Sequence, residues 1–202
     1  MAFNSYRPQR AFTPIVLNLI IINALVFLAQ NVFDGHTGWF TNFLALWGTG
    51  TGNFKPYQLV THMFAHANFL HILFNMYALW LFGTMLERTW GSAKFLIFYL
   101  VSGLGAAITQ LIFVQYGAAI GASGAVMGLL AAFAYTYPNV EFFIIPFPFA
   151  IKAKWIVAVY AAIDLFGGIS GQGGVAHFAH LGGLVTGFLL MIFWISKRRN
   201  RY

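Results

Sequence analysis

The sequence Gly121-Ala122-Ser123-Gly124-Ala125-Val126 stands at the start of an apolar stretch that extends to about residue 137. Small residues of this kind let two helix backbones approach closely, so packing is the simplest explanation for a serine among them. However, a second apolar stretch, at about 175–196, carries His180 near its matching end. A serine and a histidine placed in this way suggest a nucleophile and its base held within a membrane.

The composition is that of a membrane protein. Of the 202 residues, 60% are hydrophobic and only 7% are charged, whereas soluble domains carry roughly 25% charged residues. Too few charges remain to cover a surface that faces water, and no polar stretch is long enough for a separate soluble domain. We therefore predict one membrane-embedded domain over residues 1–202, with short tails at about 1–12 and 197–202.

The net charge of +7 does not indicate a nucleic-acid partner. Lysine and arginine lie in short clusters between or beyond the apolar runs, which is typical of a topology signal. The chain contains no cysteine, so disulfides, thiolate metal ligands and a cysteine nucleophile are excluded.

Six apolar runs are long enough to span a bilayer, which takes about 20 residues. They lie at about 13–33, 67–86, 95–115, 119–137, 149–168 and 175–196. With both termini in the cytoplasm, ten of the eleven Lys and Arg residues obey the positive-inside rule, and Lys55 alone lies outside. The predicted fold is an all-α polytopic membrane protein, a six-helix transmembrane bundle.

Two connections lie on the outer side of this predicted bundle. The long loop at about 34–66 is rich in aromatic residues, so we expect it at the membrane interface. The loop 167–174 holds five glycines in eight residues and is a candidate mobile lid. A tight connection between two helices is an equally good interpretation of this second loop.

Six polar residues in the predicted spans stand out, and on this topology all six fall in the outer half of the membrane. Such residues are functional candidates by default. They are His71, Asn75, Ser123, Asp164, His177 and His180. His71 and Asn75 are four residues apart on one helix face, so both can donate to a single oxyanion or, alternatively, satisfy a neighbouring backbone.

Two pairs of glycines suggest how Ser123 and His180 meet. Each pair lies within about one helical turn of its polar residue and allows close helix contact: Gly124 with Gly128, and Gly183 with Gly187. His180 could then accept the serine proton, and the helix start at Ser123 would favour an anion. No third member of a triad is evident, and we expect a structural role for Asp164.

Four segments, in order, resemble the rhomboid family of intramembrane serine proteases in its bacterial six-span form. They are His66–Asn75, Glu87–Ser92, Gly121–Gly124, and Ala179–Gly183 followed by Gly187. The resemblance implies that Ser123 is the nucleophile, His180 the general base, and His71, Asn75 and the Ser123 backbone N–H the oxyanion donors. His177 is one turn away, but only His180 has glycines at +3 and +7.

The resemblance also implies how the protein acts. We expect it to cleave transmembrane segments of other membrane proteins near their outer end, with no cofactor and no metal, in contact with lipid in a bacterial inner membrane. The sequence gives no oligomeric state. Two positions depart from the family pattern: Tyr57-Gln58 stands where many members have Trp-Arg, and Met127 stands where an aromatic residue often packs on the histidine.

Two other functions are compatible with these residues. One is metal or ion binding without proteolysis, because His62 and His66 have the i, i+4 spacing of metal ligands and three further histidines lie in the outer half. The other is a rhomboid-like protein that binds membrane clients without cutting them. Such proteins lack the serine or the histidine, whereas this chain has both Ser123 and His180.

Overall fold

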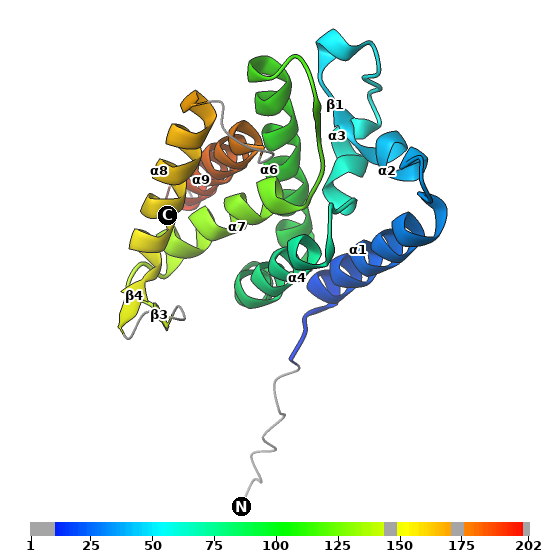
Figure 1. Cartoon of the computed structure of the whole chain (residues 1–202). Helices are drawn as coiled ribbons and strands as arrows, with labels where there is room; N and C mark the ends of the chain where they lie inside the picture. The colour runs from blue at the N-terminus through cyan, green and yellow to red at the C-terminus, as the bar shows by residue number, and fades with distance from the viewer. Residues whose placement is uncertain (1–10, 144–148, 171–175, 200–202) are drawn as a thin grey trace, which may run out of the picture.

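A computed structural model describes residues 11–143, 149–170 and 176–199 of the chain (Figure 1). Within these residues the fold is mainly helical, and five helices are long and apolar enough to cross a membrane. They are α1 (Pro14–Phe33), the continuous helix Phe69–Trp90, α6 (Ser92–Phe113), α8 (Ala153–Ser170) and α9 (His177–Arg199). Most of the predicted tails, residues 1–10 and 200–202, and residues 171–174 of the predicted lid lie outside the described part.

The remaining predicted span, 119–137, contains a shorter helix. Helix α7 (Ser123–Thr136) has 14 residues, fewer than the about 20 needed to cross a bilayer alone. It begins late because the residues before Ser123 are extended and pair with another segment of the chain. Six full spans therefore stay a prediction, while five candidate spans and one short apolar helix are observed.

The second long helix is continuous but changes its winding. It consists of α4 (Phe69–Ala78), the π-helical segment η3 (Leu79–Gly83) and α5 (Thr84–Trp90). Asn68 caps its start, because the side-chain Oδ1 accepts a hydrogen bond from His71 N at 2.9 Å. Gly91 ends it with a φ of +81° and a ψ of 157°, a conformation that glycine adopts readily because it has no Cβ.

Three chain segments meet at one end of the bundle. The Glu87 carboxylate accepts hydrogen bonds from Ile15 N and Val16 N, each at 3.0 Å, and so satisfies two free N–H groups at the start of α1. The Trp90 ring contacts the Trp194 ring of α9 with centroids 5.8 Å apart. The start of α1, the α5–α6 turn and the far end of α9 therefore share one face.

Helices α6, α7 and α9 form the tightest part of the bundle. A side-chain carbon at Gly183 would collide with the Gly124 carbonyl, and one at Gly187 would lie 2.6 Å from the Gly128 Cα. The two glycine pairs that the sequence singled out thus face each other across α7 and α9. Helix α8 is far more open, since its buried residues are Ala153, Ile156 and Asp164.

The chain between α1 and α4 is folded rather than extended. It contains α2 (Trp39–Leu44), β1 (Leu46–Trp47), η1 (Thr49–Thr51), α3 (Gln58–Thr61) and η2 (His62–Phe64). Strand β1 pairs antiparallel with β2 (Ala118–Ala119), which leads toward α7. This outer segment, residues 34–68, is therefore attached to the chain just before Ser123.

The mainly helical fold predicted from the sequence is observed, with two small antiparallel sheets in addition: β1–β2 and the hairpin β3–β4 (Glu141–Phe143 with Ala150–Lys152). The predicted lid begins too early, because residues 167–170 are the last turn of α8. Glycine has a low helix propensity, but a glycine-rich sequence can still form a helix where tertiary packing compensates that cost.

Candidate active site

Ser123 is the first residue of α7, and its position is fixed by the strand before it. Gly121 adopts a φ of +127° and donates its N–H to the His62 carbonyl at 2.8 Å. Together with the β1–β2 pairing, this bond holds the approach to Ser123 against the outer segment. The sharp turn at Gly121 leaves the Ser123 hydroxyl at the edge of a cavity rather than within the helix contact.

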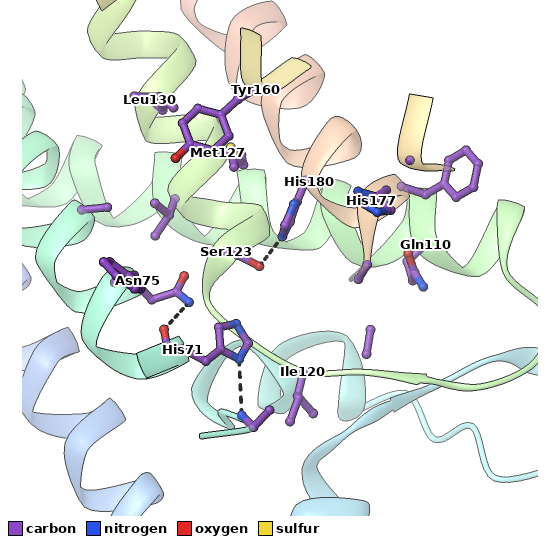
Figure 2. A pocket seen from close by; sticks show the side chains of 18 of the residues that line it. His71, Asn75, Gln110, Ile120, Ser123, Met127, Leu130, Tyr160, His177 and His180 are labelled. Carbon is purple, nitrogen blue, oxygen red and sulfur yellow. Dashed lines mark hydrogen bonds between the residues drawn. The ribbon is translucent and has the colours of Figure 1, made fainter. Parts of the chain in front are cut away.

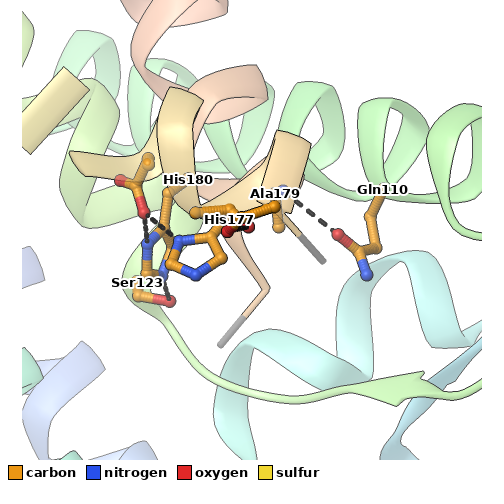
Figure 3. A network of polar contacts seen from close by, with 8 residues as sticks. Gln110, Ser123, His177, Ala179 and His180 are labelled. Carbon is orange, nitrogen blue, oxygen red and sulfur yellow. Dashed lines mark hydrogen bonds and ion pairs between the residues drawn. The ribbon is translucent and has the colours of Figure 1, made fainter. Parts of the chain in front are cut away.

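The Ser123 hydroxyl faces His180 on the neighbouring helix. Ser123 Oγ and His180 Nε2 are 2.8 Å apart, which is hydrogen-bond distance (Figures 2 and 3). The predicted pair is therefore in contact, and His180 rather than His177 makes that contact. The close glycine packing of α7 on α9 explains it, because it brings both side chains to the same end of the two helices.

A carboxylate also reaches this histidine. Asp164 Oδ1 on α8 lies 3.0 Å from His180 Nδ1 and 2.8 Å from His177 Nδ1. Asp164 is 4% exposed, so its carboxylate is almost fully removed from solvent. The sequence did not predict this contact; the one available signal was that Asp164 is the only carboxylate in the outer half of a predicted span.

His71 approaches the serine from the opposite side. Its Nδ1 accepts a hydrogen bond from Ala67 N at 3.3 Å, which places the ring proton on Nε2. That ring occupies the space beside Gly121, where a side-chain carbon would lie 2.9 Å from His71 Nε2 and 3.5 Å from Ser123 Oγ. His71 can therefore direct an N–H toward the place where an oxyanion on the Ser123 adduct would form.

Asn75 lies one turn further along α4 and lines the same cavity (Figure 2). Its Nδ2 donates to the His71 carbonyl at 2.9 Å, and the residue is 6% exposed. An amide nitrogen carries two protons, so one N–H remains for a ligand. The four site residues predicted from sequence, Ser123, His180, His71 and Asn75, are thus brought together around one space.

Gln110 is a further residue that the sequence did not single out. Its Oε1 accepts a hydrogen bond from Ala179 N at 3.2 Å, and Figure 3 shows it beside the start of α9. This N–H is one of the free donors in the first turn of the helix. Gln110 on α6 therefore holds the first turn of α9, which carries both His177 and His180.

The cavity at the site has a volume of about 1200 Å³ and is lined mainly by apolar side chains. It opens between α4, α7, α8 and α9, and its wall includes Phe74, Tyr160 and Met127. A pocket for a small molecule measures about 300–1,000 Å³. The larger volume and the apolar wall suit a peptide segment with apolar side chains.

Comparisons with known proteins identify the family. The rhomboid domain pattern matches residues 53–197, a range that contains Ser123, His180, His71 and Asn75. The chain belongs to the rhomboid family. Among its relatives, rhomboid protease AarA of Providencia stuartii is 30% identical over 214 residues, which cover 90% of this chain and 72% of that protein.

Other rhomboid relatives are longer than the matched part. Mitochondrial RHOMBOID-like protein 6 of Arabidopsis thaliana is 34% identical over 140 residues, which cover 69% of this chain and 43% of that protein. Rhomboid protease GluP of Bacillus subtilis is 30% identical over 174 residues, which cover 84% of this chain and 32% of that protein. The chain thus spans less than half the length of these two relatives.

The two departures from the usual rhomboid pattern lie in different places. Gln58 is buried in the outer segment, where its Oε1 accepts from Lys55 N at 3.0 Å, and the Tyr57 ring stacks on Phe43 at 5.0 Å. These residues stabilise the segment that carries β1. Met127 instead lines the cavity beside the catalytic candidates, so it is the departure that touches the site (Figure 2).

The two histidines considered above as possible metal ligands in the outer segment, His62 and His66, are buried. Burial lowers the pKa of His62 to about 4, and burial together with the nearby His71 lowers the pKa of His66 to about 4. His62 Nδ1 donates to the Gln58 carbonyl at 2.8 Å. Among the described residues, no three His, Asp or Glu side chains are grouped as a metal ion would require.

Proposed function

We propose that this rhomboid-family chain is an intramembrane serine endopeptidase that uses Ser123 as nucleophile and His180 as general base. The observation that best supports this function is the 2.8 Å contact between Ser123 Oγ and His180 Nε2 at the edge of a large apolar cavity. Residues of helices long enough to cross a membrane line that cavity. The names of related rhomboid proteases point to the same reaction class.

In the first half of the reaction, Ser123 Oγ attacks the carbonyl carbon of a substrate peptide bond. As the Oγ–C bond forms, the hydroxyl proton passes to His180 Nε2. The carbonyl oxygen becomes an oxyanion that accepts hydrogen bonds from His71 Nε2, Asn75 Nδ2 and the Ser123 backbone N–H. Because Ser123 begins α7, this N–H has no partner within the helix.

In the second half, the C–N bond of the substrate breaks and the amine leaves with the proton from His180. Water then attacks the acyl-enzyme carbonyl, gives a proton to His180, and the ester bond to Ser123 breaks. The proton returns to Ser123 Oγ, so the enzyme ends as it began. These steps use the two side chains twice and need no metal or cofactor.

The substrate is a transmembrane helix of another membrane protein. Its peptide bonds are paired within the helix, so it must unwind locally before Ser123 can reach one. We place its approach beside α8, which has only three buried residues along its length. Cleavage near the outer end of the substrate follows from the position of Ser123 at one end of the bundle.

The wider setting is also part of the proposal. The chain forms a single six-span domain in a bacterial inner membrane, with both termini cytoplasmic and the site toward the outer side. Five candidate spans and the short helix α7 support the membrane bundle, and the distribution of Lys and Arg supports its orientation. The outer segment lies at the interface, where its exposed Trp39 and Phe43 would contact lipid headgroups.

The test is cleavage of a model single-span substrate in proteoliposomes by the parent protein and by Ser123→Ala. The parent should cleave the substrate and should react with a serine-directed phosphonate at Ser123, as located by mass spectrometry. Ser123→Ala should lose both reactions. Ser170→Ala is the matched control, because Ser170 ends α8 and bonds only to the Gly167 carbonyl among the described contacts.

Retention of cleavage by Ser123→Ala would reject the serine mechanism. A parent that neither cleaves any single-span substrate nor reacts with the phosphonate, while it still binds such helices, would favour the client-binding function. A parent that cleaves nothing but retains a stoichiometric metal ion after purification would instead favour the metal-binding function without proteolysis that His62 and His66 suggest.

A further inference from the structure

Asp164 is a buried carboxylate whose two recorded partners are both imidazoles. Its Oδ1 lies 3.0 Å from His180 Nδ1 and 2.8 Å from His177 Nδ1, and the residue is 4% exposed. Burial of an ionised carboxylate costs several kcal/mol unless donors compensate it. The two Nδ1 atoms are in place to be those donors, and each can donate only if it carries the ring proton.

This requirement determines the tautomer of His180. A neutral imidazole has one donor nitrogen and one acceptor nitrogen. If Nδ1–H donates to Asp164, then Nε2 is unprotonated and accepts from the Ser123 hydroxyl, 2.8 Å away. In the opposite tautomer, Nε2–H would donate to Ser123 Oγ and could not accept the serine proton, and Nδ1 would face the carboxylate without a proton.

We propose that Asp164 is a positioning residue that holds His180 in the tautomer and orientation needed to deprotonate Ser123. If the function proposed above holds, Asp164 is the third residue of the mechanism, after Ser123 and His180. When His180 takes the serine proton it becomes a cation, and the adjacent carboxylate stabilises that cation. Asp164 touches neither the substrate nor Ser123, so it acts through His180 alone.

His177 completes the arrangement by fixing the carboxylate. It donates to the same Oδ1 from the start of α9, one turn before His180. Rotation of Asp164 away from His180 would break both bonds together. We therefore expect His177→Ala to weaken catalysis less than Asp164→Asn, since the first variant retains the bond between Asp164 and His180.

The test uses Asp164→Asn in the full-length protein in proteoliposomes. An amide can turn its NH₂ toward His180 Nδ1, which favours the tautomer with the proton on Nε2. Cleavage of a single-span substrate should then fall by about 100-fold or more in kcat with little change in KM, within the about 10⁴-fold that this change causes in soluble serine proteases. Asp34→Asn is the control, because Asp34 accepts from Thr41 N at 2.8 Å in the outer segment.

A second measurement does not depend on activity. Nitrogen NMR of isotope-labelled histidine should show the Nδ1–H form of His180 in the parent and the Nε2–H form in Asp164→Asn, with the signal assigned by its loss in His180→Gln. Unchanged tautomer populations, or a kcat within about threefold of the parent, would overturn the role of Asp164. If the parent itself cleaves nothing, the proposed function fails, while the tautomer measurement still decides how Asp164 and His180 interact.

Discussion

At the scale of single residues, His71 shows how the backbone prepares the site. Its Nδ1 is committed to Ala67 N at the start of α4, so the ring presents Nε2–H beside Gly121. The donor is therefore oriented before any substrate binds. A preorganised donor does not have to reorient as charge develops, which is the main source of its contribution to catalysis.

Asn75 gives a clean test of the oxyanion assignment. Asn75→Ala removes an N–H donor but leaves Ser123 and His180 in place, so kcat should fall by about 10²- to 10³-fold while KM changes little. The kinetics of cleavage of a single-span substrate measure both values.

The matched control for Asn75 is Asn23→Ala. Asn23 is also buried, and it makes the same kind of bond, from its amide to the carbonyl four residues earlier, at 2.8 Å. It lies in α1, away from the cavity. Equal losses of kcat in the two variants would mean that Asn75 matters for helix stability and not for the oxyanion.

Sequence spacing was sufficient to find some of these residues but not all. Ser123 and His180 could be paired because each is fixed relative to glycines on its own helix. The contact between Asp164 and His180 depends on the rotation of α8 about its own axis, which a spacing along the chain does not specify. Gln110 was missed for the same reason, because its partner is a backbone N–H on another helix.

At the scale of elements, the contact between α7 and α9 sets the distance from serine to histidine. The backbones are so close that Gly183 faces the Gly124 carbonyl directly, with no side chain between them. Overpacking in a core costs about 1–3 kcal/mol where side chains can shift. Here the opposing atom is backbone, so a side chain can be accommodated only if the two helices separate.

Gly183→Ala should therefore reduce both stability and activity. Alanine gains about 1 kcal/mol in helix propensity over glycine, but separation of the helices should outweigh this gain and lengthen the contact from Ser123 Oγ to His180 Nε2. We expect a lower thermal midpoint in detergent and a kcat reduced by at least about tenfold, which corresponds to about 1.4 kcal/mol of transition-state stabilisation.

Gly83→Ala is the comparison variant for this effect. Gly83 is also a tightly packed helical glycine, but a side-chain carbon there would meet the ends of Val16 and Phe95 at 3.0 and 3.1 Å. Those side-chain ends can shift, and they are remote from the site. A similar loss of kcat in both variants would show that general destabilisation, and not the α7–α9 distance, controls activity.

Elements differ in how far the sequence predicts them. The long apolar runs predicted the positions of α1, α6, α8 and α9 because hydropathy and length are local properties. Strands β1 and β2 have two residues each and pair across more than seventy positions, so no period in the sequence indicates them. That pairing also explains why α7 is shorter than the apolar run in which it lies.

At the scale of the whole molecule, the bundle has two distinct ends. At one end, Glu87 of α5 accepts a hydrogen bond from Ile15 N at the start of α1, and Trp194 of α9 contacts Trp90, the last residue of α5. At the other end, the outer segment contacts the strand before Ser123. These contacts show which elements lie at each end, while the side of the membrane on which each end lies is a prediction from the distribution of Lys and Arg.

The absence of cysteine from the sequence makes that orientation testable, because a single introduced thiol has no background. Asn53→Cys places an exposed thiol in the outer segment, and Glu141→Cys places one in β3, beyond the opposite end of α7. In intact bacterial cells, a membrane-impermeant maleimide should label Asn53→Cys, whereas Glu141→Cys should react only after lysis. Labelling after lysis confirms that both thiols are accessible. The reverse pattern would place Ser123 on the cytoplasmic side, and the positive-inside interpretation would then be wrong.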